Sequence, residues 1–168
     1  MKLHDLTRRQ RILTVVTAGV IAAGLLSWLA WPEPAAAPPR ERQYKATTAC
    51  LLTDEHDLRG DLAKAAWAGM REASEATLIK VQYLAITGPQ TPANGLTFYN
   101  TLGGQRCTVI VAAGDLPVAA MVQGLSSFPQ IKQVTIGGDP QGKPVTVIDP
   151  TRPDTIAAGV KSVVAAAA

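Results

Sequence analysis

The stretch 48-TACLLTDEHDLRGDLAKAAWAGM-70 decides the fold of this chain. Its first six residues are β-branched or apolar, which predicts a buried strand over residues 48–53. From Asp61 onward the apolar residues recur at helical spacing and share one stripe: Leu62, Ala65, Ala66, Gly69, Met70 and Ala73. A buried strand followed by an amphipathic helix is the repeating unit of doubly wound α/β domains.

The same alternation continues to the end of the chain. Further strands are expected at residues 78–86, 107–112, 133–136 and 145–148. Further helices are expected to begin at the Thr91-Pro92 cap, at Asp115 and at Asp154, whereas residues 137–144 are too few and too rich in glycine for a helix. Right-handed crossovers then predict an α/β fold with a doubly wound, mainly parallel five-stranded sheet in the order 2-1-3-4-5.

An apolar run, Ile12–Trp31, precedes this domain and carries no charge. A helix of this length spans about 30 Å, the thickness of the hydrocarbon core of a bilayer. The basic tail 1–11 precedes the run, and Trp28 and Trp31 end it, which is the pattern of a transmembrane helix with a cytoplasmic N-terminus. We therefore expect a single-pass signal-anchor in the plasma membrane and an extracytoplasmic C-terminal domain.

A cleaved signal peptide is the alternative to an anchor, and it would make the protein secreted. The nearest cleavage-like site, 35-AAA-37, is followed at once by Pro38, which disfavours cleavage. Residues 32–45 are rich in proline, alanine and charge, so they are expected to form an extended spacer. The globular domain is expected at residues 46–168, which is enough for one core.

The net charge of +3 does not indicate nucleic-acid binding. Lys2 and three arginines against Asp5 already account for it before the apolar run begins. From Cys50 onward nine basic residues face ten acidic ones. A nucleic-acid partner requires a clustered basic face, and the sequence shows none.

Four stretches carry a resemblance to a known family: 49-ACLLTDEHDLRGDLAKAAWAGM-70, 107-CTVIVAAGD-115, 126-SSFPQIKQVTIGGD-139 and 145-VTVIDPTRPDTIAAGVKSVVAA-166. They resemble the first lobe of the basic membrane protein (BMP) family, the substrate-binding components of nucleoside-type ABC transporters. The resemblance implies a periplasmic-binding-protein-like fold, a nucleoside or sugar ligand, and a transporter or another membrane protein as partner. Family members close two lobes on a ligand, so self-association or another protein would be needed to complete the cleft here.

Ligands of doubly wound domains bind beyond the carboxyl ends of the strands. The candidate ligand-binding residues of the loops expected there are Asp54, Asp57, Gly114, Asp115, Asp139 and Asp149. The resemblance places Asp54 on the family's aspartate at the end of the first strand. These loops contain no aromatic ring that could stack on a base or a sugar, so weak binding is expected.

No catalytic, metal or cofactor motif follows any strand. The run 54-DEHD-57 holds four potential metal ligands, but consecutive residues cannot all converge on one ion. The sequence therefore predicts a non-enzymatic protein without cofactor or metal. The alternative function is a ligand-free protein-interaction or structural module whose contact surface includes an apolar rim of Ala113, Leu116 and Pro117.

The two cysteines belong to neighbouring strands in the expected order. Cys50 lies early in the first strand and Cys107 opens the third. An oxidising compartment favours a Cys50–Cys107 disulfide. Two separate buried thiols are the alternative.

Overall fold

A computed structural model describes residues 43–168. The predicted tail 1–11, the predicted anchor 12–31 and nearly all of the predicted spacer lie outside the described residues. Residues 42–168 form one compact unit of the chain. Within residues 43–168, no helix is both long enough and apolar enough to cross a membrane.

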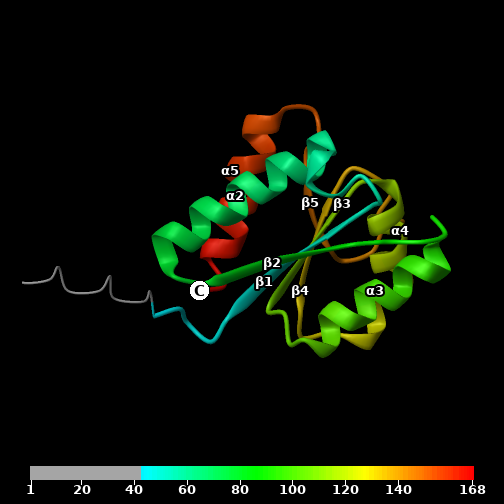
Figure 1. Cartoon of the computed structure of the whole chain (residues 1–168), viewed down its shortest axis with the longest axis horizontal. Helices are drawn as coiled ribbons and strands as arrows, with labels where there is room; N and C mark the ends of the chain where they lie inside the picture. The colour runs from blue at the N-terminus through cyan, green and yellow to red at the C-terminus, as the bar shows by residue number, and fades with distance from the viewer. Residues whose placement is uncertain (1–42) are drawn as a thin grey trace, which may run out of the picture. The chain divides into compact units, whose positions relative to one another are not determined.

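The sheet has five parallel strands in the order β2-β1-β3-β4-β5, which confirms the predicted topology (Figure 1). The strands are β1 (Thr48–Thr53), β2 (Lys80–Ala85), β3 (Val109–Ala113), β4 (Lys132–Ile136) and β5 (Thr146–Ile148). The helices are α2 (Asp61–Thr77), α3 (Pro92–Gly104), α4 (Asp115–Gly124) and α5 (Pro153–Ala165), with 3-10 turns η1 (Asp57–Arg59) and η2 (Leu125–Ser127).

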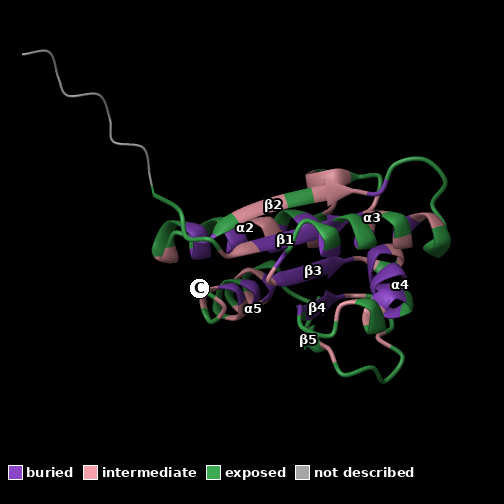
Figure 2. Ribbon diagram, turned by 90° about the horizontal axis from the view of Figure 1, so that it is seen from below, coloured by how far each residue is buried: buried purple, intermediate pink, exposed green. Residues whose placement is uncertain are grey.

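The helices form one layer on each face of the sheet. Helices α2 and α5 cover one face, and α3 and α4 cover the other (Figures 1 and 2). Each face has its own apolar core, and residues of β1 alternate between the two: Leu51 faces α2 and α5, whereas Cys50 and Leu52 face α3 and α4. Figure 2 shows the central strands as buried and β5 as an exposed edge.

Several predicted boundaries differ from the structure, and three of the differences have a structural cause. Strand β2 begins two residues later than expected because Leu78, with φ of 62°, takes a left-handed conformation that ends α2. Strand β3 begins at Val109 because its ladder with β1 starts there, so Cys107 precedes the strand. The prediction that Asp154 caps α5 is wrong: Arg152 is the N-cap, Pro153 occupies the first helical position, and Asp154 lies in the first turn.

The predicted disulfide is confirmed between Cys50 and Cys107. Both residues are buried on the α3 side of the sheet, and their Cα atoms are 5.9 Å apart. Because Cys107 lies two residues before β3 begins, the bridge runs diagonally and does not distort the ladder, in which Cys50 pairs with Ile110. The side-chain amide of Gln82 on β2 lies 3.2 Å from Cys50 Sγ and covers the bridge.

A buried polar network joins α3 to β4. The Tyr99 hydroxyl donates a hydrogen bond of 2.8 Å to Gln133 Oε1, and Gln133 Nε2 donates to the carbonyl oxygens of Phe128 and Leu125 at 3.2 Å and 3.4 Å. Tyr99 is fully buried, and Gln133 is 7% exposed. Burial raises the pKa of Tyr99 to about 12, although the hydrogen bond with Gln133 acts in the opposite direction.

This pKa shift predicts a loss of stability at alkaline pH. In the unfolded chain Tyr99 ionises near pH 10, whereas in the folded domain it stays protonated until about pH 12. Its contribution is therefore complete below pH 10 and disappears as the pH rises towards 12, by about 2–3 kcal/mol. Urea unfolding between pH 10 and 12 should show this loss.

The Tyr99→Phe variant tests the same contact. Its free energy of unfolding at neutral pH should be lower by about 1–3 kcal/mol, because the Gln133 oxygen loses its partner, and its stability should decline less at alkaline pH. An equal decline in both proteins would contradict the assignment.

Candidate functional site

Three loops meet at the carboxyl edge of the sheet, at the point where the strand order reverses. The chain leaves β1 towards β2 on one side and leaves β3 towards β4 on the other, so the loops that follow β1 and β3 flank the switch point, where doubly wound domains hold their ligands. This place is called the crevice below. Asp54 follows β1, and Gly114 follows β3. A Cβ atom built on Gly114 would lie 4.0 Å from Asp54 Oδ2, and one built on Gly137 would lie 4.0 Å from the Cα of Gly114.

Glycine suits position 114 because of its backbone conformation. Its φ of 101° lies in a region that side-chain-bearing residues rarely adopt. Its N–H donates a hydrogen bond of 2.9 Å to the carbonyl oxygen of Ile136, which ties the loop after β3 to the end of β4. The Asp54 carboxylate therefore faces bare backbone at this position.

Asp54 presents one oxygen to its own loop and one to the crevice. Its Oδ1 accepts a hydrogen bond of 2.9 Å from the backbone N–H of His56 and lies 3.4 Å from His56 Nδ1. Among the described residues, no hydrogen bond reaches Oδ2, and the side chain is 37% exposed. An ionised carboxylate accepts several hydrogen bonds, so Oδ2 is available to a donor group of a ligand.

Asp57 has an unusual environment in the same loop. Its φ is 60°, a left-handed conformation that is uncommon outside glycine, although asparagine and aspartate adopt it more readily than most residues. Its Oδ1 atom is buried and has no hydrogen-bond partner among the described residues. An unpaired buried carboxylate oxygen is the kind of local cost that concentrates at functional sites.

The other candidate residues do not join this group. Asp139 accepts a hydrogen bond of 2.8 Å from the N–H of Gln141, and Asp149 accepts one of 2.9 Å from the N–H of Thr151. Hydrogen bonds from Thr151 are the main cause that lowers the pKa of Asp149, with Arg152 adding to it. Both aspartates thus shape their own turns, and Asp115 is an exposed residue in the first turn of α4. Over residues 43–168, no three His, Cys, Asp or Glu side chains converge as metal ligands would.

The expected apolar rim is wrong. Ala113 is 3% exposed and Pro117 is buried, while Leu116 packs against the core beneath α4. These residues are buried because β3 and the first turn of α4 lie at the centre of the domain, flanked by β1 and β4. These three residues therefore do not form an exposed apolar rim.

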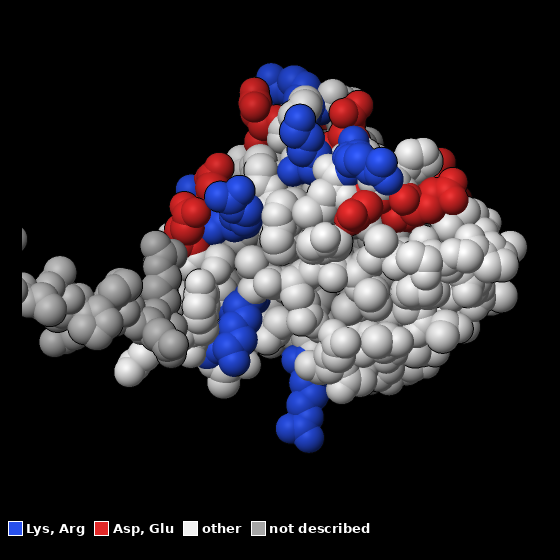
Figure 3. Space-filling view, viewed as in Figure 1, with Lys and Arg blue, Asp and Glu red and all other residues white. Residues whose placement is uncertain are grey.

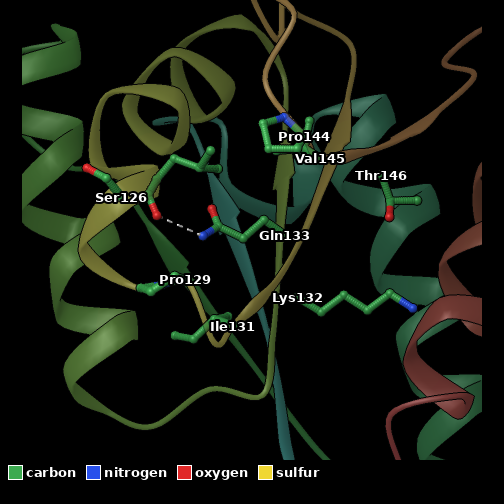
Figure 4. A pocket seen from close by; sticks show the side chains of 9 residues that line it. Ser126, Pro129, Ile131, Lys132, Gln133, Pro144, Val145 and Thr146 are labelled. Carbon is green, nitrogen blue, oxygen red and sulfur yellow. Dashed lines mark hydrogen bonds between the residues drawn. The ribbon is translucent and has the colours of Figure 1, made fainter.

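Two surface hollows were not predicted from the sequence. One is an open groove of about 770 Å³ between the amino-terminal halves of α2 and α5, with Leu62, Ala65 and Ile156 among its apolar lining. The other, of about 480 Å³, lies where β4 extends beyond β5, and Figure 4 shows Pro144 and Val145 on one side of it and Pro129 and Ile131 on another. The only sequence signal for the groove between α2 and α5 is the set of small residues on these two helices. The hollow beside β4 arises because β4 extends beyond β5, and no local sequence pattern predicts such an offset.

The left-handed φ and the unpaired buried oxygen of Asp57 predict a measurable effect of its substitution. Asparagine adopts this conformation readily and leaves no unpaired buried charge, so Asp57→Asn should raise the free energy of unfolding by about 0.5–1 kcal/mol. Chemical denaturation of the two proteins measures this difference. Glu55→Gln, an exposed change in the same loop, should stay within about 0.5 kcal/mol of the parent. A loss of stability in Asp57→Asn would show that the Asp57 carboxylate has a structural partner.

No family model matches the chain, and no curated protein matches it. Among solved structures, a fragment described as a lipoprotein of Peptoclostridium difficile 630 aligns with a TM-score of 0.61 and 12% identity, over 72% of this chain and 98% of the other. An ABC transporter solute-binding protein of Aeropyrum pernix K1 aligns with a TM-score of 0.48 and 20% identity, over 60% of this chain and 27% of the other. The XylFII-LytSN complex aligns with a TM-score of 0.44 and 14% identity, over 60% of this chain and 37% of the other. At these identities, what the chain shares with the lipoprotein fragment is the fold.

Proposed function

We propose that the chain is a membrane-anchored, extracytoplasmic binding module, built as a single lobe of the BMP type, which holds a small solute without transforming it. The observation that carries this proposal is the meeting of Asp54, Gly114 and Gly137 at the strand reversal. An oriented carboxylate beside exposed backbone is the arrangement that a doubly wound lobe uses to hold a small polar ligand.

The chemistry of the crevice favours a ligand that donates hydrogen bonds. Asp54 offers an unpaired oxygen on a side chain that is 37% exposed. The hydroxyl groups of a nucleoside or a simple sugar can donate to it. A phosphate group would meet the acidic side chains of the edge, including Asp115, and is therefore disfavoured.

The proposed location rests on the apolar run 12–31 and agrees with the disulfide. Disulfides persist outside the cytoplasm and are rare within it. A C-terminal alkaline phosphatase fusion, which is active only outside the cytoplasm, tests this placement. Activity of the fusion is the expected result, and an inactive, stably expressed fusion would refute the proposed topology.

A second wall is needed to enclose the ligand, because the described domain supplies only one. Two copies of this chain placed edge to edge would bring acidic loops together, which disfavours self-association at this surface. We therefore propose that a different membrane protein, such as a transporter subunit, supplies the second wall.

Isothermal calorimetry on the full chain in lipid nanodiscs tests the binding proposal, with a panel of nucleosides, simple sugars and the matching nucleoside monophosphates. We expect micromolar to submillimolar binding of an uncharged member and binding at least about tenfold weaker for its monophosphate, because of charge repulsion.

Asp54→Asn should weaken binding about tenfold or more, as expected for loss of a charged hydrogen-bond acceptor. Glu55→Gln, its exposed neighbour, is the matched control and should bind like the parent. No heat at millimolar ligand would refute the proposal.

A further inference from the structure

The two ends of the sheet differ in charge. Acidic residues follow the strands at the carboxyl edge, as described above, and are mixed there with basic residues such as Arg59 and Arg152. Basic residues stand at the amino ends, where Lys45 and Arg106 shortly precede β1 and β3, and Lys80 and Lys132 begin β2 and β4. All four are exposed, and they are called the basic pole below.

The strand register places Lys80 and Lys132 at nearly the same height along the strands of the sheet. Lys80 lies opposite Thr48 of β1, and Lys132 lies opposite Val109 of β3. Figure 3 shows Lys and Arg atoms at the lower left with no Asp or Glu atoms beside them, whereas both signs mix on the upper part of the molecule. The four residues therefore lie at one end of the sheet, with Lys80 on its α3 side and Lys132 on its α2 and α5 side by the alternation along their strands.

The charge of the basic pole is not neutralised by nearby acids. The acidic residues in the second half of α2 already have partners: Glu72 lies 3.1 Å from Lys161, and Glu75 lies 3.9 Å from Arg71. Among the described residues, no acidic side chain forms an ion pair with a member of the basic pole. The pole therefore presents a free positive charge of four.

Exposed apolar side chains lie beside these charges. Tyr44 is 47% exposed and Leu78 is 38% exposed, and they are neighbours because the N–H of Lys45 donates a hydrogen bond of 2.8 Å to the carbonyl oxygen of Leu78. A hollow of about 340 Å³ adjoins them, lined in part by Tyr44 and Lys80. Tyrosine and lysine side chains each combine an apolar body with a polar tip. Such side chains are typical of protein surfaces that contact lipid headgroups.

We infer that the basic pole, with Tyr44 and Leu78, is a contact surface for an anionic lipid bilayer. Charge complementarity favours this partner, because each Lys or Arg near an anionic membrane strengthens binding about fivefold. Chain order agrees with it, since residue 43 enters the domain at this same end, five residues before β1. The contact would point the crevice with Asp54, at the opposite end of β1, away from the membrane. The inference holds whether or not the crevice binds a solute.

The full chain, reconstituted in nanodiscs of phosphatidylcholine with or without phosphatidylglycerol, tests the inference. An environment-sensitive fluorophore is attached at Tyr44→Cys, and in a second protein at Glu55→Cys at the carboxyl edge. With phosphatidylglycerol at low salt, we expect the label at residue 44 to shift to the blue and to be shielded from iodide. High salt should reverse the shift. The label at residue 55 should remain exposed in every disc.

A matched pair of charge variants separates this contact from a general effect of charge. Lys45→Gln, Lys80→Gln and Arg106→Gln together should lower the ratio of contacting to free domain on the order of 100-fold. The control triple, Arg59→Gln, Lys143→Gln and Arg152→Gln, removes the same charge from exposed residues near the carboxyl edge and should leave the ratio unchanged. If the chain does not insert into discs, co-sedimentation with vesicles of the same composition must show the same contrast. Equal exposure of the label at residue 44 in both lipids, or equal effects of both triples, would overturn the inference.

Discussion

Removal of the Cys50–Cys107 disulfide is expected to lower the free energy of unfolding by about 4 kcal/mol. The bridge closes a loop with a sequence separation of 57, and a cross-link over that length removes a corresponding amount of entropy from the unfolded chain. For a domain whose total stability is of the order of 5–15 kcal/mol, this loss is large. Urea unfolding of the Cys50→Ala/Cys107→Ala variant and of the parent measures it directly.

A reductant provides the control for this prediction. It should destabilise the parent by a similar amount and leave the double alanine variant unchanged. A difference below about 1 kcal/mol between parent and variant would mean that the unfolded chain is already restricted, or that the cross-link strains the native sheet. A difference that small would contradict the view that the disulfide stabilises the central strands.

Substitution of Gly69 by leucine should destabilise the domain by about 3 kcal/mol or more. A Cβ atom at this position would overlap the carbonyl oxygen of Ala157 on α5, which is rigid backbone. The helices α2 and α5 would have to separate, and the core between them, including Met70 and Ile156, would lose its packing. Thermal and urea unfolding of Gly69→Leu should show the loss. Gly69→Ala should show a smaller loss in the same direction, despite the better helix propensity of alanine.

Gly104→Ala is the matched control on another helix. No atom lies within 4 Å of a Cβ built at Gly104, the last residue of α3. The change should be neutral or should stabilise by up to about 1 kcal/mol, because alanine restricts the unfolded chain. A Gly69 variant as stable as this control would contradict the close approach of α2 and α5.

The topology could be predicted because each crossover carries a local signal. The buried strand 48–53, the stripe that begins after Asp61 and the Thr91-Pro92 cap all fall where the structure has them, and Thr91 Oγ1 accepts the N–H of Asn94 as an N-cap does. The start of β2 was placed too early because a left-handed Leu78 leaves no mark in the sequence. The cap of α5 was misplaced because an aspartate in the first helical turn resembles a capping aspartate.

The candidate site could be predicted only in part. The position of Asp54 follows from the end of β1, but its proximity to Gly114 and Gly137 depends on how three loops meet in space. The left-handed φ of Asp57 could not be predicted, since aspartate is an ordinary residue in a polar loop. The burial of Ala113 and Pro117 could not be predicted either, because the end of a central strand and the first turn of the next helix are enclosed by their neighbours, and local hydropathy does not report that.

Hydrogen–deuterium exchange of the full chain is the direct test of a solute site at the strand reversal. Exchange is measured with and without the tightest-binding member of the nucleoside and sugar panel, at millimolar concentration. We expect slower exchange at residues 54–57, 113–115 and 137–139, where β1, β3 and β4 end, and no change at the amino ends of the strands. Protection confined to another part of the molecule, or none with any ligand, would contradict a solute site at the strand reversal.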